Sequence, residues 1–129
     1  MHCCAIRSSL QSVVMEAAAP GDTSQLLKGV LDLAVMAVLS EQDSYGYGVL
    51  RRLRDEGLSD VGDASVYGTL RRLYQAGMLS SYLVPSDEGP HRKYYGLNDR
   101  GSAALDRSAQ SWGSITTALN HLLNGRGPK

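Results

Sequence analysis

The segment GDASVYGTLRRLYQAGML, residues 62–79, decides the fold class of this 129-residue chain. Its apolar residues recur at spacings of four and three, which is typical of a helix with one buried face. Asp63 is suited to the N-cap and Gly77 to the C-terminal end, so the pattern predicts a helix over residues 64–76. The residues expected to face the core are Val66, Leu70 and Leu73.

Two more helices are predicted before this segment. Apolar residues are dense over residues 26–39, which predicts a mostly buried helix. The polar run of residues 41–44 interrupts the pattern. Ser44 is suited to cap a second helix, which runs over residues 45–56 and ends at Gly57.

A hairpin and a long helix are predicted after the segment. Residues 79–84 and 91–97 flank a turn rich in Ser, Asp, Gly and Pro, which is typical of two paired strands. Asn98 is suited to cap a helix that reaches Asn124. About twenty-five residues at about 1.5 Å each make a helix of about 38 Å.

Part of this last helix is expected to project from the domain. A compact domain of this size has a radius of gyration of only about 14 Å. The apolar residues of the helix form a near-heptad stripe, and a projecting apolar stripe needs a partner. The same stripe on a second copy supplies one, so we predict a homodimer with two-fold symmetry. The stripe consists of Leu105, Ala109, Trp112, Ile115, Leu119 and Leu122.

The order of elements predicts a mainly α fold with a small β-hairpin. Three helices, a hairpin and a long helix correspond to a winged helix-turn-helix over residues 25–97 and a dimerisation helix over residues 98–124. Residues 125–129 are expected to form a tail. Residues 1–24 end in a linker-like cluster and are expected to form a disordered arm, in which Met15 is a candidate native start.

Charge and cysteine content limit the function classes. Thirteen basic residues balance thirteen acidic residues, which argues against a broad positive field but allows a compact basic patch. The only cysteines are the neighbours Cys3 and Cys4, which cannot form an ordinary structural disulfide, and this excludes a disulfide scaffold. The longest apolar run is too short to span a membrane, so a cytoplasmic protein with no membrane partner is expected.

The third predicted helix has the composition of an element that approaches DNA. In a winged helix-turn-helix this helix enters the major groove with its N-terminal residues first. Ala64 and Gly68 are small, and the Ser65 and Thr69 hydroxyls are suited to phosphate or base contacts. Two adjacent arginines, residues 71–72, supply positive charge.

Short motifs follow one another along the predicted helices and hairpin. They are Leu27-Lys28-Gly29, Tyr45-Gly46-Tyr47, Ser65-Val66-Tyr67, Leu70-Arg71-Arg72-Leu73, Gly77-Met78-Leu79, Arg92-Lys93-Tyr94-Tyr95, Leu97 and Gly101. In this order and at this spacing the chain resembles the PadR family of bacterial transcriptional regulators, in particular its short members with a single C-terminal helix. The resemblance covers roughly residues 26–123.

The resemblance implies a homodimeric repressor that binds a near-palindromic operator in double-stranded DNA and is released by a small molecule. It places Tyr67 on the recognition helix and Tyr47 near the DNA backbone, and it makes Arg92 and Lys93 the basic pair of the wing. The family commonly has proline after the recognition-helix tyrosine, where this chain has Gly68. The candidate DNA-binding residues are therefore Tyr47, Ser65, Tyr67, Gly68, Thr69, Arg71, Arg72, Arg92 and Lys93.

Trp112 in the middle of the stripe has two interpretations. It is either an anchor of the dimer core or, as the resemblance suggests for some short members, one wall of a cavity that two copies form for a planar apolar effector.

Two alternative functions stay open. The first is a winged helix that binds a protein and no DNA. The second is a metal- or redox-responsive regulator that uses His2-Cys3-Cys4, although a disordered leader is the simpler interpretation of these residues and no metal site is expected. No paired carboxylates, phosphate loop or nucleophile–base pair occurs, so neither an enzyme nor a cofactor is predicted.

Overall fold

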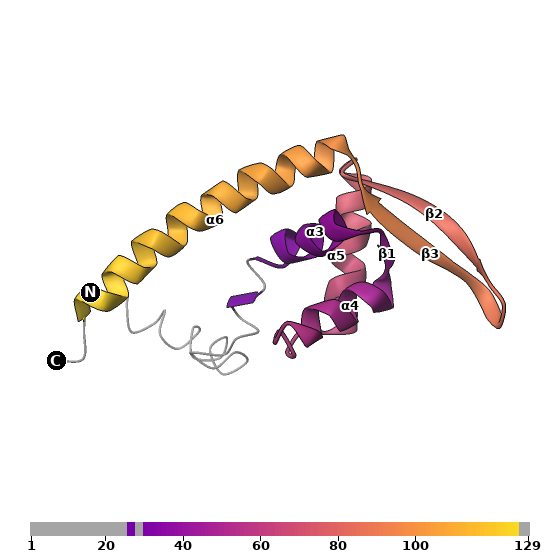
Figure 1. The fold of residues 1–129 in the computed structure, drawn as a ribbon, viewed down its shortest axis with the longest axis horizontal. Helices are drawn as coiled ribbons and strands as arrows, with labels where there is room; N and C mark the ends of the chain where they lie inside the picture. The colour runs from indigo at the N-terminus through magenta and orange to yellow at the C-terminus, as the bar shows by residue number, and fades with distance from the viewer. Residues whose placement is uncertain (1–25, 28–29, 127–129) are drawn as a thin grey trace, which may run out of the picture.

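A computed structural model describes residues 26, 27 and 30–126 of the chain. Three short helices form one body, from which a β-hairpin and a long C-terminal helix extend in different directions (Figure 1). This is the predicted mainly helical winged helix-turn-helix. The elements are α3 (Leu31–Glu41), β1 (Ser44–Tyr45), α4 (Gly46–Asp55), α5 (Asp63–Gln75), β2 (Leu79–Ser86), β3 (Gly89–Leu97) and α6 (Asp99–Arg126).

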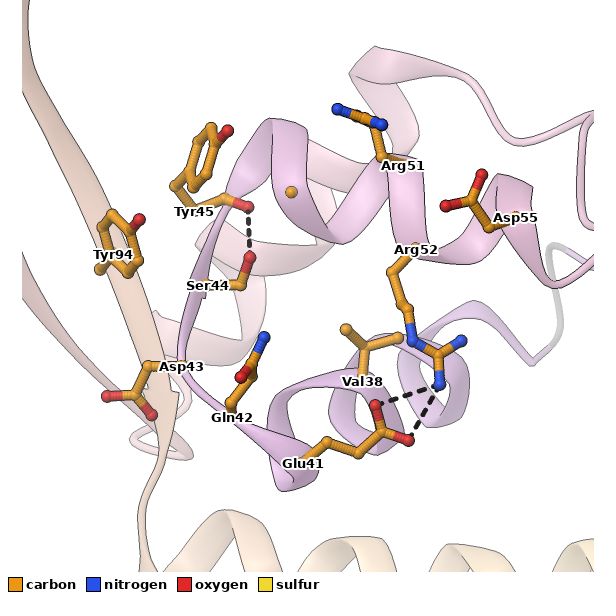
Figure 2. Close-up of a pocket in the computed structure, with 11 residues that line it drawn as sticks. Val38, Glu41, Gln42, Asp43, Ser44, Tyr45, Arg51, Arg52, Asp55 and Tyr94 are labelled. Atoms are coloured by element: carbon orange, nitrogen blue, oxygen red, sulfur yellow. Dashed lines mark hydrogen bonds and ion pairs between the residues drawn. The ribbon is translucent and has the colours of Figure 1, made fainter.

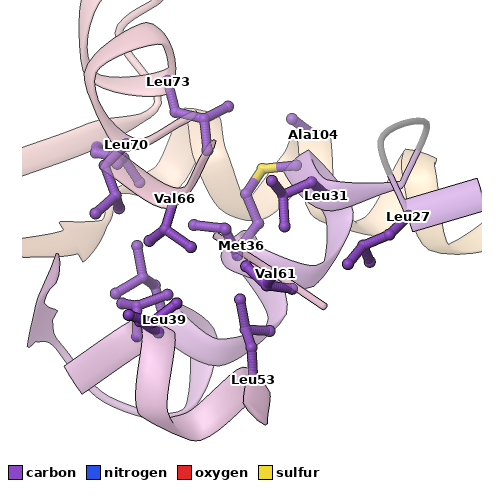
Figure 3. Close-up of a cluster of buried hydrophobic side chains, with 14 residues drawn as sticks. Leu27, Leu31, Met36, Leu39, Leu53, Val61, Val66, Leu70, Leu73 and Ala104 are labelled. Atoms are coloured by element: carbon purple, nitrogen blue, oxygen red, sulfur yellow. The ribbon is translucent and has the colours of Figure 1, made fainter. Parts of the chain in front are cut away.

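The core lies where α3, α4 and α5 meet. Figure 3 shows side chains from these helices and from Val61 converging around Met36. The predicted inward residues of α5 are buried, as their periodicity requires. They are Val66, Leu70 and Leu73. Leu79 at the base of the hairpin and Ala104 of α6 complete the core, so both projecting elements are rooted in it.

Three predicted helix starts differ from the structure. Leu26 and Leu27 are helical, but α3 itself begins at Leu31, because Val30 has a non-helical conformation with φ −124° and ψ 10°. Ser44 does not cap α4; it lies in β1, where pairing with β3 holds the backbone extended. Asp63 is the first residue of α5 rather than its N-cap, and its carboxylate lies 3.6 Å from the Arg54 guanidinium.

The hairpin belongs to a three-stranded antiparallel sheet of order β1-β3-β2. Its strands are longer than predicted, and only Asp87 and Glu88 lie between them. Pro85 occupies the register irregularity between Val84 and Ser86, on a strand at the edge of the sheet. Proline has no N–H group to donate to a neighbouring strand, and it is tolerated there because an irregular position on an edge strand does not require one.

Asn98 caps α6, as predicted. Its Oδ1 accepts a hydrogen bond from the Gly101 N–H at 2.9 Å, and its Nδ2 donates to the Gly77 carbonyl at 3.0 Å. The start of α6 is thereby fastened to the end of α5. The C-terminal half of α6 extends past the helical body (Figure 1). Within the described residues, no helix has both the length and the apolar composition that crossing a membrane would require.

Candidate nucleic-acid interface

One face of α5 is exposed along its whole length. Ala64, Tyr67, Arg71 and Gln75 follow one another at spacings of three and four, and all are exposed. Gly68 lies beside this row with open space in front of it, since a Cβ added there would meet no atom within 4 Å. The predicted small, aromatic and basic residues of this helix therefore share one accessible surface.

Tyr67 is held in place by the N-terminus of α4. A Cβ at Gly46 would lie 2.7 Å from Cδ1 and 2.9 Å from Cζ of the Tyr67 ring, and closer still to Cε1. Only a residue without a side chain allows this approach. Tyr67 is nevertheless 43% exposed. The two helices of the helix-turn-helix are thus joined through the residue expected to meet DNA.

One of the predicted contacts on α5 needs correction, and another lies on the flank of the helix. Thr69 is only 4% exposed, because it lies at the edge of the buried face, and it is not available to DNA. Arg72 is exposed but points to the flank of the helix, where its guanidinium is ion-paired with Asp32 of α3. Ser65 lies on the same flank, in a hollow between α3 and α5 that Arg72 also lines. Of the residues predicted on α5, Tyr67, Gly68 and Arg71 lie on the outward face.

The outer face of the sheet carries a ladder of three tyrosines. Tyr45, Tyr94 and Tyr82 are register partners on β1, β3 and β2, with ring centroids 5.3 Å and 5.9 Å apart. The Tyr82 hydroxyl donates a hydrogen bond to Asp43 at 2.6 Å. This bond is the main cause that raises the pKa of Tyr82 above its ordinary value.

Two cations lie over tyrosine rings, one in this ladder and one next to it. The Arg92 guanidinium lies 4.7 Å from the centroid of the Tyr45 ring, and that of Arg51 lies 5.9 Å from the Tyr47 ring. Tyr45 and Tyr47 are themselves 6.5 Å apart. The predicted residues Tyr47 and Arg92 therefore belong to one exposed aromatic and basic surface, and Arg51 is a further member that the sequence did not single out.

Lys93 lies on the other face of the hairpin. Its Nζ is 5.5 Å from the centroid of the Tyr74 ring and 5.7 Å from that of Tyr95. Tyr74 is in the last turn of α5 and is half-exposed. The sequence analysis did not select it, although its position seven residues after Tyr67 places both rings on similar sides of the helix.

A polar hollow of about 360 Å³ lies beside the tyrosine ladder. Figure 2 shows the Tyr45 and Tyr94 rings on one side of it and the Arg52–Glu41 ion pair on the other. Hydrogen bonds and charge attraction from Glu56 and Glu41 raise the pKa of Arg52. Among the described residues, no group of three His, Cys, Asp or Glu side chains is placed to hold a metal ion. His2, Cys3 and Cys4 lie outside the described residues.

The apolar stripe of α6 is mostly exposed in the single chain. Leu105 is half-buried against the core, and Ala109 is exposed. Trp112 is 45% exposed and Leu122 is 70% exposed, and Ile115 and Leu119 are similarly open. Leu123, which the near-heptad pattern did not include, adds to this surface. An apolar groove of about 600 Å³ runs between α3 and α6, and Trp112 and Leu119 form part of its wall.

Comparison with known proteins gives a consistent result. The model of the family described as "Transcriptional regulator PadR-like family" matches residues 35–107. A PadR-like transcriptional regulator from Bacillus cereus is 36% identical, with a TM-score of 0.69 over 77% of this chain and 96% of that chain. A PadR family transcriptional regulator from Eggerthella lenta is 29% identical, with a TM-score of 0.65 over 92% of this chain and 96% of that chain. An uncharacterised protein of Lysinibacillus sphaericus is 24% identical over 79% of this chain and 95% of its own length.

Proposed function

This chain belongs to the PadR-like family of transcriptional regulators, and on that premise we propose that it binds double-stranded DNA as a homodimer through α5 and the β2–β3 wing. The family consists of transcription regulators rather than enzymes. The proposal concerns the DNA-contacting residues, the dimer and the response to an effector.

The exposed row on α5 is the observation that carries the DNA-binding proposal. Tyr67, Gly68 and Arg71 lie on the outward face of a helix whose opposite face is rooted in the core. Small residues let the helix enter a groove, and Arg71 supplies a charge for a base edge or a phosphate. Tyr47 and Arg92 extend the same chemistry to the start of α4 and to the wing. Ser65 lies at the flank of the row, and we expect its hydroxyl to contact a phosphate at the edge of the groove.

The exposed stripe of α6 supports the homodimer. Its apolar side chains and the groove between α3 and α6 leave a contiguous apolar surface that a single chain does not cover. The stripe of a second copy is apolar as well and is proposed to cover the exposed stripe, and the two-fold symmetric pair then carries two copies of α5. Paired recognition helices require a near-palindromic operator with half-sites about 34 Å apart.

The effector is proposed to bind beside Trp112, at the groove between α3 and α6. Trp112 forms part of the groove wall, next to the surface that the second copy covers, so a planar apolar molecule bound there alters how the two copies pack. Release of a repressor from its operator follows if that change moves the two copies of α5 apart.

Salt-dependent binding tests the proposal. Genomic fragments are captured with the purified protein. Affinity for the recovered duplexes is then measured by fluorescence anisotropy over salt concentrations from about 50 to 300 mM, a range in which the affinity of a protein with several phosphate contacts falls by orders of magnitude. Contact with about six to ten phosphates per dimer gives a slope of log K against log salt of about −5 to −9. Arg71→Gln is expected to weaken binding and to make the slope less negative by about 1 to 2 per dimer. Arg100→Gln in the first turn of α6 is the matched control with the same charge change. Absence of binding at low salt would favour a protein-interaction module.

A further inference from the structure

The hairpin contacts the helical body at two levels: at the base of the hairpin and farther along its strands. Leu79 and Leu97 fix the base, one buried and one half-buried. Beyond them, Lys93 leaves β3 opposite Leu83 and reaches the ring of Tyr74 in the last turn of α5. A wing residue is therefore in contact with the end of the recognition helix.

The other face of the hairpin is attached separately. The Tyr82 hydroxyl donates to Asp43, in the loop before β1, and the Arg92 guanidinium lies over Tyr45 of β1. These contacts are made to β1 and the loop before it, whereas Lys93 contacts α5. The angle of the wing is thus held from two sides, and Lys93 is the side-chain contact directed at the helix that is expected to enter the groove.

The position of Lys93 between two rings favours a structural role for its charge. An ammonium group over one exposed tyrosine ring gains about 0.5–1 kcal/mol, and here two rings flank it. Tyr95 is half-buried and packs against the core, so it gives the ammonium group a fixed partner. Movement of Lys93 to a phosphate would give up both ring contacts.

We propose that Lys93 sets the angle between the wing and α5 by spanning Tyr74 and Tyr95, and that it acts on DNA as a positioning residue rather than by neutralising a phosphate. The inference rests on the proposed DNA-binding function. Tyr74 is then part of the same device, although it need not contact DNA. The sequence placed Lys93 among the candidate DNA-binding residues, as one of the basic pair of the wing, and a phosphate contact and a positioning role make different predictions.

Four variants separate the two roles. Lys93→Gln removes the charge and Tyr74→Leu removes the ring, while Lys93→Arg and Tyr74→Phe keep a cation and a ring face. Affinity is measured as a function of salt on duplexes recovered by genomic capture. We expect Lys93→Gln and Tyr74→Leu each to weaken binding about 2- to 5-fold per subunit with an unchanged salt slope. The double variant is expected to be no weaker than either single one, and the two conservative variants should bind like the wild-type protein.

A measurement without DNA makes the test independent of the operator. Amide hydrogen exchange over residues 82–95 is expected to be faster in Lys93→Gln and Tyr74→Leu, and unchanged in α4. Two outcomes overturn the proposal: unchanged exchange in the hairpin, or a salt slope that becomes less negative by about 0.9 per site in Lys93→Gln while Tyr74→Leu binds normally. Failure of the wild-type protein to bind any DNA is a different result, which would refute the proposed function itself.

Discussion

Replacement of Gly46 by alanine tests the contact that joins the two helices of the helix-turn-helix. A Cβ at residue 46 would lie 2.7 Å and 2.9 Å from two carbon atoms of the Tyr67 ring and closer to a third. Carbon atoms at rest are about 3.5–4.0 Å apart, so the ring must move. Alanine itself is favourable in a helix by up to about 1 kcal/mol relative to glycine. The measured loss in the free energy of unfolding is therefore the cost of the clash minus this gain in helix propensity.

The expected size of the effect follows from these two opposing terms. Insertion of a methyl group into a packed site costs about 1–3 kcal/mol, and the ring of Tyr67 relieves part of this by swinging toward solvent. We expect Gly46→Ala to lower the free energy of unfolding by about 1–2 kcal/mol. We also expect it to weaken DNA binding, because the displaced ring no longer occupies its place on the outward face of α5.

A double-mutant cycle with Tyr67→Ala isolates the contact. In the Tyr67→Ala background the clash is gone, so Gly46→Ala should be neutral or stabilising by up to about 1 kcal/mol. Urea denaturation at one fixed protein concentration measures both values, since the stability of a dimer depends on concentration. Gly68→Ala is the matched control: a Cβ there meets nothing within 4 Å, and it should stabilise the protein by about 0.5–1 kcal/mol. An equal loss of stability from Gly46→Ala with and without the Tyr67 ring would refute the reasoning.

Three further changes have defined outcomes. Asn98→Ala should destabilise the protein by about 1–2 kcal/mol in urea denaturation, because it removes both the cap of α6 and the bond to the end of α5, whereas Asn98→Asp keeps the capping oxygen and should lose less. Leu119→Glu should convert a dimer to a monomer in sedimentation velocity, while Gln110→Glu, on the opposite side of α6, should leave the dimer intact. Asp43→Asn should lower the raised pKa of Tyr82 in an NMR titration of ring-labelled tyrosine. Because that pKa is raised in the folded state, its contribution to stability is complete below about pH 10 and is lost as pH rises through the folded value; the variant should lack this dependence.

The helices of the fold were predictable because their pattern is local. Val66, Leu70 and Leu73 repeat at helical spacing, and one buried face is enough to predict an element such as α5. Thr69 shows where this reasoning stops. Its hydroxyl suggests a surface residue, but the core extends to its side of the helix. Only the packing of the other elements against α5 determines how wide the buried face of this helix is.

Contacts between distant residues were not predictable. Arg72 and Asp32 are forty residues apart, and no spacing rule joins them. Tyr74 and Lys93 meet because the hairpin folds back toward the end of α5, which depends on the angle of the wing. Ser44 was expected to cap a helix because serine favours that position, but pairing of β1 with β3 took precedence over this local preference.

The partners of the basic residues explain how a chain with no net charge presents a positive surface. Arg52, Arg54 and Arg72 are ion-paired with carboxylates of the same chain, so their charges are compensated. Within the described residues, the ion pairs do not include Arg51 or Arg92, which lie over tyrosine rings instead.

A ring orients a cation through its quadrupole but carries no net charge, so the positive charge of the cation remains available to an anion. The chain has seven tyrosines and no phenylalanine. A tyrosine presents a ring face to a cation while its hydroxyl meets water or, as in Tyr82, a carboxylate. Of the described cations outside the ion pairs, Arg51, Arg71 and Arg92 lie on α4, α5 and the wing, and Arg100 and Arg107 lie on α6. Net charge is a poor guide to DNA binding when the compensating carboxylates lie elsewhere on the surface.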